Sequence, residues 1–229
     1  MNWKKFLAGV ALATGVQASA SAAIVTLDGA KFDISFDDAL VGLFGTPTIV
    51  GDVVRWFPSG TPGFTASTTT RDTTVFTNST FAFTIVADPG YVLTGGALTE
   101  AGDYLMFGAG SQVAATGQVR MTSLNPAAPT VIGAITSSTF SETPFPALET
   151  KNWNASGSVN VAPASAANVS IQNILVAYAG DAAGPRGAFI EKKEVFFSVS
   201  ALPIPEPSTW AMFGVGVAMM GFALRKKMR

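Results

Sequence analysis

Apolar and polar residues alternate with a period of two along most of the chain between positions 23 and 202. In residues 32–37, three apolar residues fall on one side and three polar residues on the other, as in a strand with one buried face. The same alternation recurs at 81–86, 113–121 and 195–199, whereas no helical apolar period extends beyond about two turns. The pattern predicts an all-β fold.

Turn-forming residues separate these runs, at 61–63, 88–90, 95–96, 108–110, 125–126 and 181–187. Short strands at this spacing predict an antiparallel β-sandwich over residues 23–202, jelly-roll-like, with about ten to twelve strands. A closed barrel is the competing architecture, because the period of two is the same in both.

Three local irregularities lead to further expectations. The apolar positions at 174, 176 and 178 are out of phase with those at 169 and 171, which predicts a β-bulge near Gln172-Asn173. The charged run Glu191-Lys192-Lys193-Glu194 is typical of an exposed edge strand protected by charge. A short helical turn is expected at 145–150.

The beginning of the chain has the features of a secretory signal peptide. Lys4 and Lys5 precede an apolar run at 6–16, and small residues follow up to Ala22. The apolar run is too short for a stable membrane span, and the small residues suit signal peptidase. We therefore predict a signal peptide at 1–22, export through the Sec translocon, and cleavage after Ala22.

The end of the chain combines three features in a fixed order: Pro205-Glu206-Pro207, an uncharged run at 208–224, and the basic residues Arg225, Lys226, Lys227 and Arg229. As a helix, the uncharged run would be about 25 Å long, slightly shorter than the hydrocarbon core of about 30 Å. Basic side chains can make up the difference by reaching the headgroups. We predict a single transmembrane helix at about 208–224, with the basic tail 225–229 in the cytoplasm.

This order of triad, apolar run and basic end resembles the C-terminal sorting signal of PEP-CTERM proteins, the substrates of exosortases, over residues 203–229. The resemblance implies that an exosortase recognises Pro205, Glu206 and Pro207 and cleaves near them. It also implies transient anchoring in the inner membrane of a Gram-negative bacterium, with the domain in the periplasm, and then transfer to the cell surface or extracellular matrix. An ordinary anchor that contains the triad by chance is the alternative.

Composition narrows the chemistry of the part between the two ends. Six of the chain's 14 basic residues but only one of its 15 acidic residues lie in the terminal segments, so the part between them has a net charge of −6. An acidic surface argues against nucleic acid as a partner. The chain has no cysteine and no histidine, which excludes disulfides, histidine-dependent nucleophiles and the usual zinc ligands. No catalytic motif is present, and we expect no enzymatic activity and no cofactor.

The sequence suggests two candidate binding sites. Asp33 and Asp37 share one strand face and offer oxygen ligands for Ca²⁺, although an exposed polar face needs no ligand to explain it. Trp153 lies in the polar stretch Lys151-Asn152-Trp153-Asn154, which predicts a loop or strand edge and makes it a candidate glycan contact.

The sequence therefore predicts an exported structural or adhesive protein of the envelope or matrix. A carbohydrate-binding module acting on exopolysaccharide is the second hypothesis. An exopolysaccharide hydrolase is the third, although no motif nominates a catalytic pair of carboxyl groups.

Overall fold

The structure is a computed structural model that describes residues 23–58, 63–143, 145–205 and 212–220. The described residues form twelve strands, two short 3₁₀ helices and one helix at 212–220. The strands are β1 (Ile24–Asp28), β2 (Phe32–Asp37), β3 (Thr48–Val50), β4 (Val53–Trp56), β5 (Phe64–Thr68), β6 (Thr73–Ala87), β7 (Tyr91–Phe107), β8 (Gln112–Asn125), β9 (Val131–Ser137), β10 (Lys151–Ala164), β11 (Ala166–Ala179) and β12 (Gly187–Pro203). The 3₁₀ helices are η1 (Asp38–Leu40) and η2 (Gly42–Phe44).

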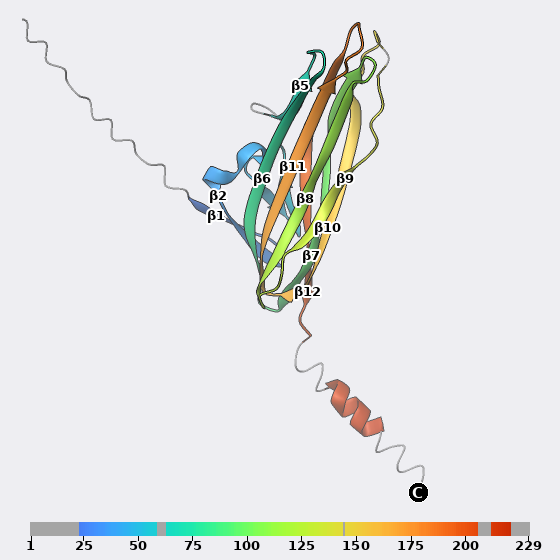
Figure 1. Cartoon of the computed structure of the whole chain (residues 1–229). Helices are drawn as coiled ribbons and strands as arrows, with labels where there is room; N and C mark the ends of the chain where they lie inside the picture. The colour runs from blue at the N-terminus through green and yellow to red at the C-terminus, as the bar shows by residue number, and fades with distance from the viewer. Residues whose placement is uncertain (1–22, 59–62, 144, 206–211, 221–229) are drawn as a thin grey trace, which may run out of the picture.

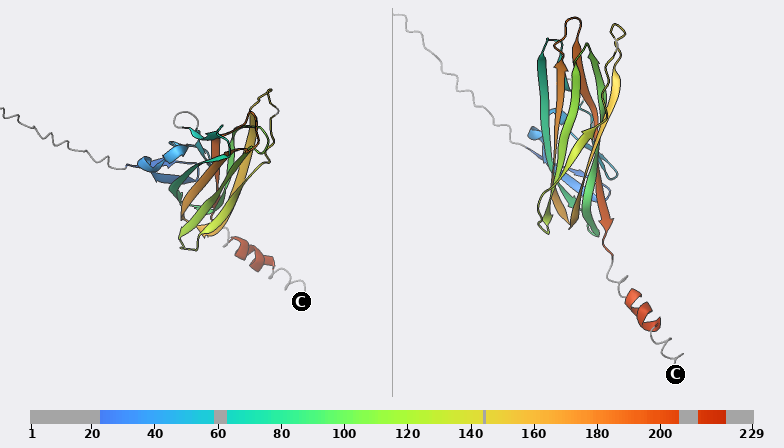
Figure 2. Two further views of the ribbon diagram at one scale, coloured as in Figure 1. Left: turned by 45° about the horizontal axis from the view of Figure 1, so that its top comes forward. Right: turned by 45° about the vertical axis from the view of Figure 1, so that its right-hand side comes forward.

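All strands belong to one antiparallel sheet, in the order β1-β2-β6-β11-β8-β9-β10-β7-β12-β4-β3, with β5 paired to β12. The sheet folds over so that β6, β11 and β8 face β7 and β12 across a core, which gives an elongated, nearly closed shape (Figures 1 and 2). At one open side, the Thr77 hydroxyl of β6 donates to the carbonyl of Thr65 in β5 over 2.6 Å. The predicted all-β antiparallel fold is confirmed. Because β9 and β10 connect the two layers into one sheet, the structure lies between the predicted sandwich and the competing closed barrel.

The burial of β11 follows a strict period of two over its whole length. All its odd-numbered residues from Ala167 to Ala179 are buried, and the strand pairs without a register shift against β6. The predicted bulge near Gln172-Asn173 is therefore wrong. Asn173 is a fully buried polar residue on the apolar face. Because a polar residue interrupts the apolar positions there, the sequence pattern looks as if the buried face changes at this point.

Aromatic side chains fill the core between the layers. Phe44 of η2, Trp56 of β4 and Phe81 of β6 contact one another with ring centroids 5.2–6.1 Å apart, in tilted or edge-to-face geometry. Phe83 extends the cluster to Phe197 on β12, at 5.9 Å. Because aromatic pairs in such geometries contribute beyond their buried area, this cluster takes the stabilising place that disulfides occupy in many exported proteins.

The turn predicted at Gly95-Gly96 is not present. These residues lie inside β7 and form no turn. A Cβ atom on Gly96 would lie 2.3 Å from the Phe197 ring, so the missing side chain makes room for an aromatic residue of the neighbouring strand. The helical turn expected at 145–150 is also wrong, since the described residues of this segment have no helical structure.

The strand β12 is an interior strand of the sheet. It pairs with β7 along its whole length and, on its other side, with β5 and β4. The run Glu191-Lys192-Lys193-Glu194 is therefore not an exposed edge, as predicted, but lies in the middle of a strand with partners on both sides.

Beyond β12, the chain leaves the domain at the end where β6 turns into β7, and the amide of Ile204 donates to the carbonyl of Gly90 over 2.8 Å. Residues 212–220 form a helix (Figure 1). Within the ranges that the structure describes, no helix has the length and apolar character needed to span a bilayer. The predicted signal peptide, Glu206, Pro207 and the basic tail lie outside the described residues.

Candidate functional site

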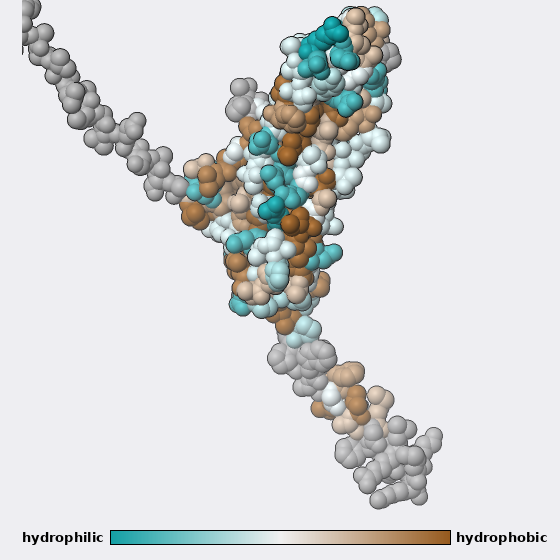
Figure 3. Space-filling model, in the orientation of Figure 1, coloured by the Kyte–Doolittle hydropathy of each residue, from teal (hydrophilic) through white to brown (hydrophobic). Residues whose placement is uncertain are grey.

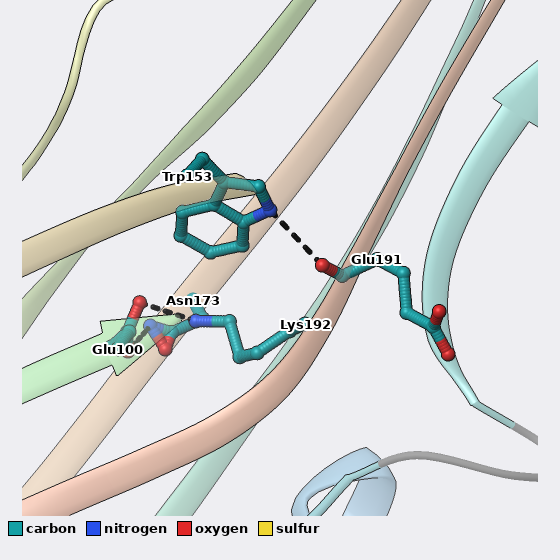
Figure 4. A network of polar contacts seen from close by, with 5 residues as sticks. All are labelled: Glu100, Trp153, Asn173, Glu191 and Lys192. Carbon is teal, nitrogen blue, oxygen red and sulfur yellow. Dashed lines mark hydrogen bonds and ion pairs between the residues drawn. The ribbon is translucent and has the colours of Figure 1, made fainter. Parts of the chain in front are cut away.

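The core contains an ion pair between Lys192 of β12 and Glu100 of β7. Both side chains are only 1% exposed, and Lys192 Nζ donates to Glu100 Oε2. The other carboxyl oxygen, Oε1, accepts a hydrogen bond of 2.5 Å from Nδ2 of Asn173 on β11. Three strands thus bring one amine, one carboxyl and one carboxamide together inside the protein, as Figure 4 shows. The sequence pattern alone does not single out these residues as a site.

Lys192 lies on the inner face of the sheet, directly before a β-bulge. The register between β12 and β7 shifts between Lys192, which lies opposite Gly102, and Glu194, which lies opposite Ala101. The extra residue lets Lys192 and Val195 both point inward, while Lys193 and Glu194 point outward. The bulge thereby shifts the buried phase, so that Val195 rather than Glu194 is the next inward residue after Lys192.

Burial dominates the electrostatics of the pair. Desolvation raises the pKa of Glu100, and the nearby Lys192 and Asn173 only partly oppose this shift. Desolvation also lowers the pKa of Lys192 to about 8, against the opposing effect of Glu100. Both shifts favour the uncharged forms, because charges taken out of water lose their solvation. Lys192 therefore gives up its proton more readily than a lysine at the surface does.

Two aromatic rings enclose the lysine. Nζ of Lys192 lies 5.3 Å from the ring centroid of Phe64 and 5.7 Å from that of Trp153, distances suited to cation–π contact. Trp153 lies in β10, is 2% exposed, and donates from Nε1 to the carbonyl of Glu191 over 3.0 Å (Figure 4). The predicted loop or strand-edge position of Trp153 is wrong. A ring buried so deeply offers no face to a sugar, and its structural role is to cover the lysine.

Gly102 provides the space in which the indole and the bulge fit. A Cβ atom there would lie 1.9 Å from the carbonyl oxygen of Glu191 and 2.8 Å from Nε1 of Trp153. We expect Gly102→Ala to lower the free energy of unfolding by about 1–3 kcal/mol, because the backbone of β12 must move to relieve the overlap. Urea denaturation measures the change. Ala97→Val, which adds bulk at an exposed position of the same strand, is the control, and equal losses in the two variants would contradict the prediction.

The two candidate calcium ligands have separate surroundings. Asp33 lies opposite Asp28 in the pairing of β2 with β1, and desolvation followed by repulsion from Asp28 and Asp88 raises its pKa. Asp37 accepts a hydrogen bond of 2.9 Å from the amide of Ala39 and so caps η1. Their predicted position on one outward strand face is confirmed by the burial pattern. Among the described residues, no group of three or more carboxylates is arranged to hold a metal ion.

A shallow groove of about 430 Å³ crosses the outer face of β2, β6, β11 and β8. Its polar lining includes Asp37, Thr84, Arg120 and Asn168, and Thr84 donates to the Asn168 side chain over 2.9 Å. Figure 3 shows polar and apolar residues interspersed over the side of the domain that carries these strands. The groove offers hydrogen-bonding groups of both kinds to a polar ligand.

The C-terminal segment has a simple local structure where it is described. Pro203 is the last residue of β12, and Ile204 and Pro205 continue without regular structure. The helix at 212–220 contains only apolar residues and glycine, and its large side chains are mostly exposed: Met212, Phe213, Val215, Val217, Met219 and Met220. This apolar surface is not covered by the β domain.

Comparison with known families identifies the same segment. Residues 203–227 match the PEP-CTERM protein-sorting motif, so the predicted resemblance is confirmed and the chain carries this sorting signal directly after its last strand. The motif implies export and membrane-anchored processing by an exosortase. No curated protein matches the chain.

Proposed function

We propose that the protein is an exported structural or adhesive component of the envelope or extracellular matrix of a Gram-negative bacterium, delivered by an exosortase. The observation that carries the proposal is the sorting motif at 203–227, which follows β12 without an intervening domain. The β domain is then the part that remains at the cell surface or in the matrix after cleavage near Pro205-Glu206-Pro207.

Delivery follows from the physical properties of the two ends. The signal peptide at 1–22 starts export, and a helix at about 208–224 halts it in the inner membrane. The uncovered apolar side chains at 212–220 support this anchor, because such a surface is stable only when it is buried in lipid or protein. Four basic residues beyond the helix favour a cytoplasmic tail and a periplasmic domain.

A role without catalysis is supported by the chemistry of the chain. It contains no histidine or cysteine, and Glu100, whose pKa is raised by burial, is sealed in the core. A hydrolase acting on a polysaccharide needs accessible carboxyl groups at a defined separation. The single wrapped sheet with a closely packed aromatic core suits a component that must be durable.

Carbohydrate binding is the second candidate function, and the groove over β2, β6, β11 and β8 is the observation that favours it. Exopolysaccharide would contact Arg120, Asn168 and Asp37 by hydrogen bonds, in place of the aromatic platform expected at Trp153. Binding of the bacterium's own exopolysaccharide that is lost in Arg120→Ala would favour this function over a purely structural one.

The mass of the protein recovered from cells tests the proposal directly. We expect a chain that begins at Ala23, ends close to Pro205-Glu206-Pro207 and is found in the envelope or the medium. Recovery of the full chain from the cytosol with both ends intact would overturn the proposal.

A further inference from the structure

The buried amine, carboxyl and carboxamide groups have a chemical use that the sorting function does not include. We propose that Nζ of Lys192 and the side-chain carbonyl carbon of Asn173 join in an intramolecular isopeptide bond, with Glu100 as the catalytic residue that transfers the proton. The proposal rests on the arrangement of these three side chains and is independent of the sorting signal.

Glu100 brings the two reacting groups together. Its Oε2 accepts from the amine of Lys192, and its Oε1 accepts from the amide of Asn173 at 2.5 Å. The two oxygens belong to one carboxyl group, so the nucleophile and the amide converge on the same small volume, as Figure 4 shows. Such pre-positioning converts an otherwise slow reaction between two groups into an effectively unimolecular one.

The environment favours the reactive forms of the groups. An amine attacks a carbonyl only when it is uncharged, and burial lowers the pKa of Lys192 to about 8. Burial also raises the pKa of Glu100, so the carboxyl group can accept the lysine's proton. Among the described residues, no donor lies within hydrogen-bonding distance of Asn173 Oδ1. A half-turn of the amide would place this oxygen against Glu100, whose protonated form donates to it and polarises the carbonyl.

The reaction balances without any further reactant. Lys192 passes a proton to Glu100, and the free amine then attacks the carbonyl carbon of Asn173. A new C–N bond forms, the bond from that carbon to Nδ2 breaks, and the nitrogen leaves as ammonia. Glu100 gives one proton to the departing nitrogen and takes one from the attacking nitrogen, so the carboxyl group is protonated again when ammonia leaves. No oxidant, metal or cofactor takes part.

Seclusion protects the reaction from its main competitor, hydrolysis of the amide by water. Lys192 and Glu100 are each 1% exposed, Asn173 is fully buried, and the rings of Phe64 and Trp153 lie over the amine. Exclusion of water also strengthens the electrostatic effect of Glu100 on the reacting groups.

The bond would connect parts of the sheet that backbone hydrogen bonds do not connect. β11 pairs with β6 and β8, whereas β12 pairs with β7, β4 and β5. The two strands face each other across the core, and the bond would fasten one layer to the other. In a chain without cysteine, it would be a covalent cross-link of the domain.

Peptide mapping of the wild-type protein recovered from cells tests the proposal. Trypsin cleaves after lysine and arginine, so it releases residues 152–186, which contain Asn173, and cuts separately after Lys192 and Lys193. We expect instead one product in which 152–186 is joined to 187–193, with the cut after Lys192 lost. Its mass should be lower than the sum of the two peptides by one ammonia molecule. Because both peptides lie inside the domain, the result does not depend on how the ends of the chain are processed.

Variants identify the chemistry. Lys193→Met removes the neighbouring exposed lysine and should leave the link intact, whereas Glu100→Gln and Asn173→Ala should abolish the joined product. Asparagine can also lose ammonia by cyclising onto its own backbone, but trypsin would then still cut after Lys192. Recovery of folded wild-type protein in which 152–186 is unlinked and the cut after Lys192 is complete would overturn the proposal, whether or not the variants fold.

Discussion

Replacement of Glu206 with alanine should leave the protein unprocessed in the inner membrane. In the sequence, the triad lies between a domain that ends with β12 at Pro203 and a predicted span that begins at about 208, which is where a membrane-embedded enzyme would need it. Removal of the carboxylate eliminates the only charge between the domain and the basic tail. A hydrogen bond to a charged group contributes about 1.5–3 kcal/mol, so processing should fall about tenfold or more.

Cell fractionation followed by immunoblotting measures the processed fraction. The domain should remain folded, because Glu206 lies beyond the last strand. Glu194→Ala is the control: it removes an exposed carboxylate of β12 that lies outside the motif and should be processed as the wild type is. Equal release of the Glu206 variant and the wild type would refute recognition through the triad.

Removal of the buried carboxyl group should have the largest effect on folding. Glu100→Ala leaves the amine of Lys192 in the core without its counter-charge, and we expect a loss of about 3–5 kcal/mol in the free energy of unfolding. The proposed isopeptide bond also requires Glu100, so its absence adds to the loss. Urea denaturation of the purified variant measures the change.

The chain itself provides a matched control three residues away. Asp103 lies on the same strand and pairs with Lys193, the lysine next to Lys192, but these side chains are 24% and 43% exposed. Water solvates both charges when the pair is broken, so Asp103→Ala should change stability little. If both variants lose the same stability, burial is not what makes the Glu100 pair important.

The sequence predicts strands well where one face is wholly apolar. β2 and the apolar positions of β6 and β8 lie as the period of two indicates, with Phe32, Ile34 and Phe36 buried. The number of strands and most turns follow from the same alternation and from glycine and proline between the runs. How the sheet closes does not follow from it, because a local period carries no information about which strands become neighbours.

The core polar residues show why the site itself is not predictable in this way. Asn173, Glu100 and Lys192 each stand alone among apolar residues on one face of a strand, and a polar residue is ordinarily assigned to solvent. Each is stable inside only because the other two are there, from strands 73 and 92 residues away along the chain. The available signal is the combination: three strands, each with one polar residue in the buried phase.

Polar neighbours also explain why the sequence predicts a loop or strand edge at Trp153. Its neighbours Asn152 and Asn154 point outward from β10 and are exposed, whereas the indole points inward. In a strand, adjacent residues report on opposite faces, so polar neighbours are evidence for a buried tryptophan rather than against it.

The direct passage of β12 into the anchor segment has a mechanical consequence. Any pull on the membrane attachment would act along β12, which is bonded to β7 from Gly187 to Pro203 and holds Lys192 in its middle. A load in that direction shears the two strands past each other, so many hydrogen bonds must yield together rather than one after another as in peeling. The domain is therefore oriented to resist tension that is applied at its C-terminal end.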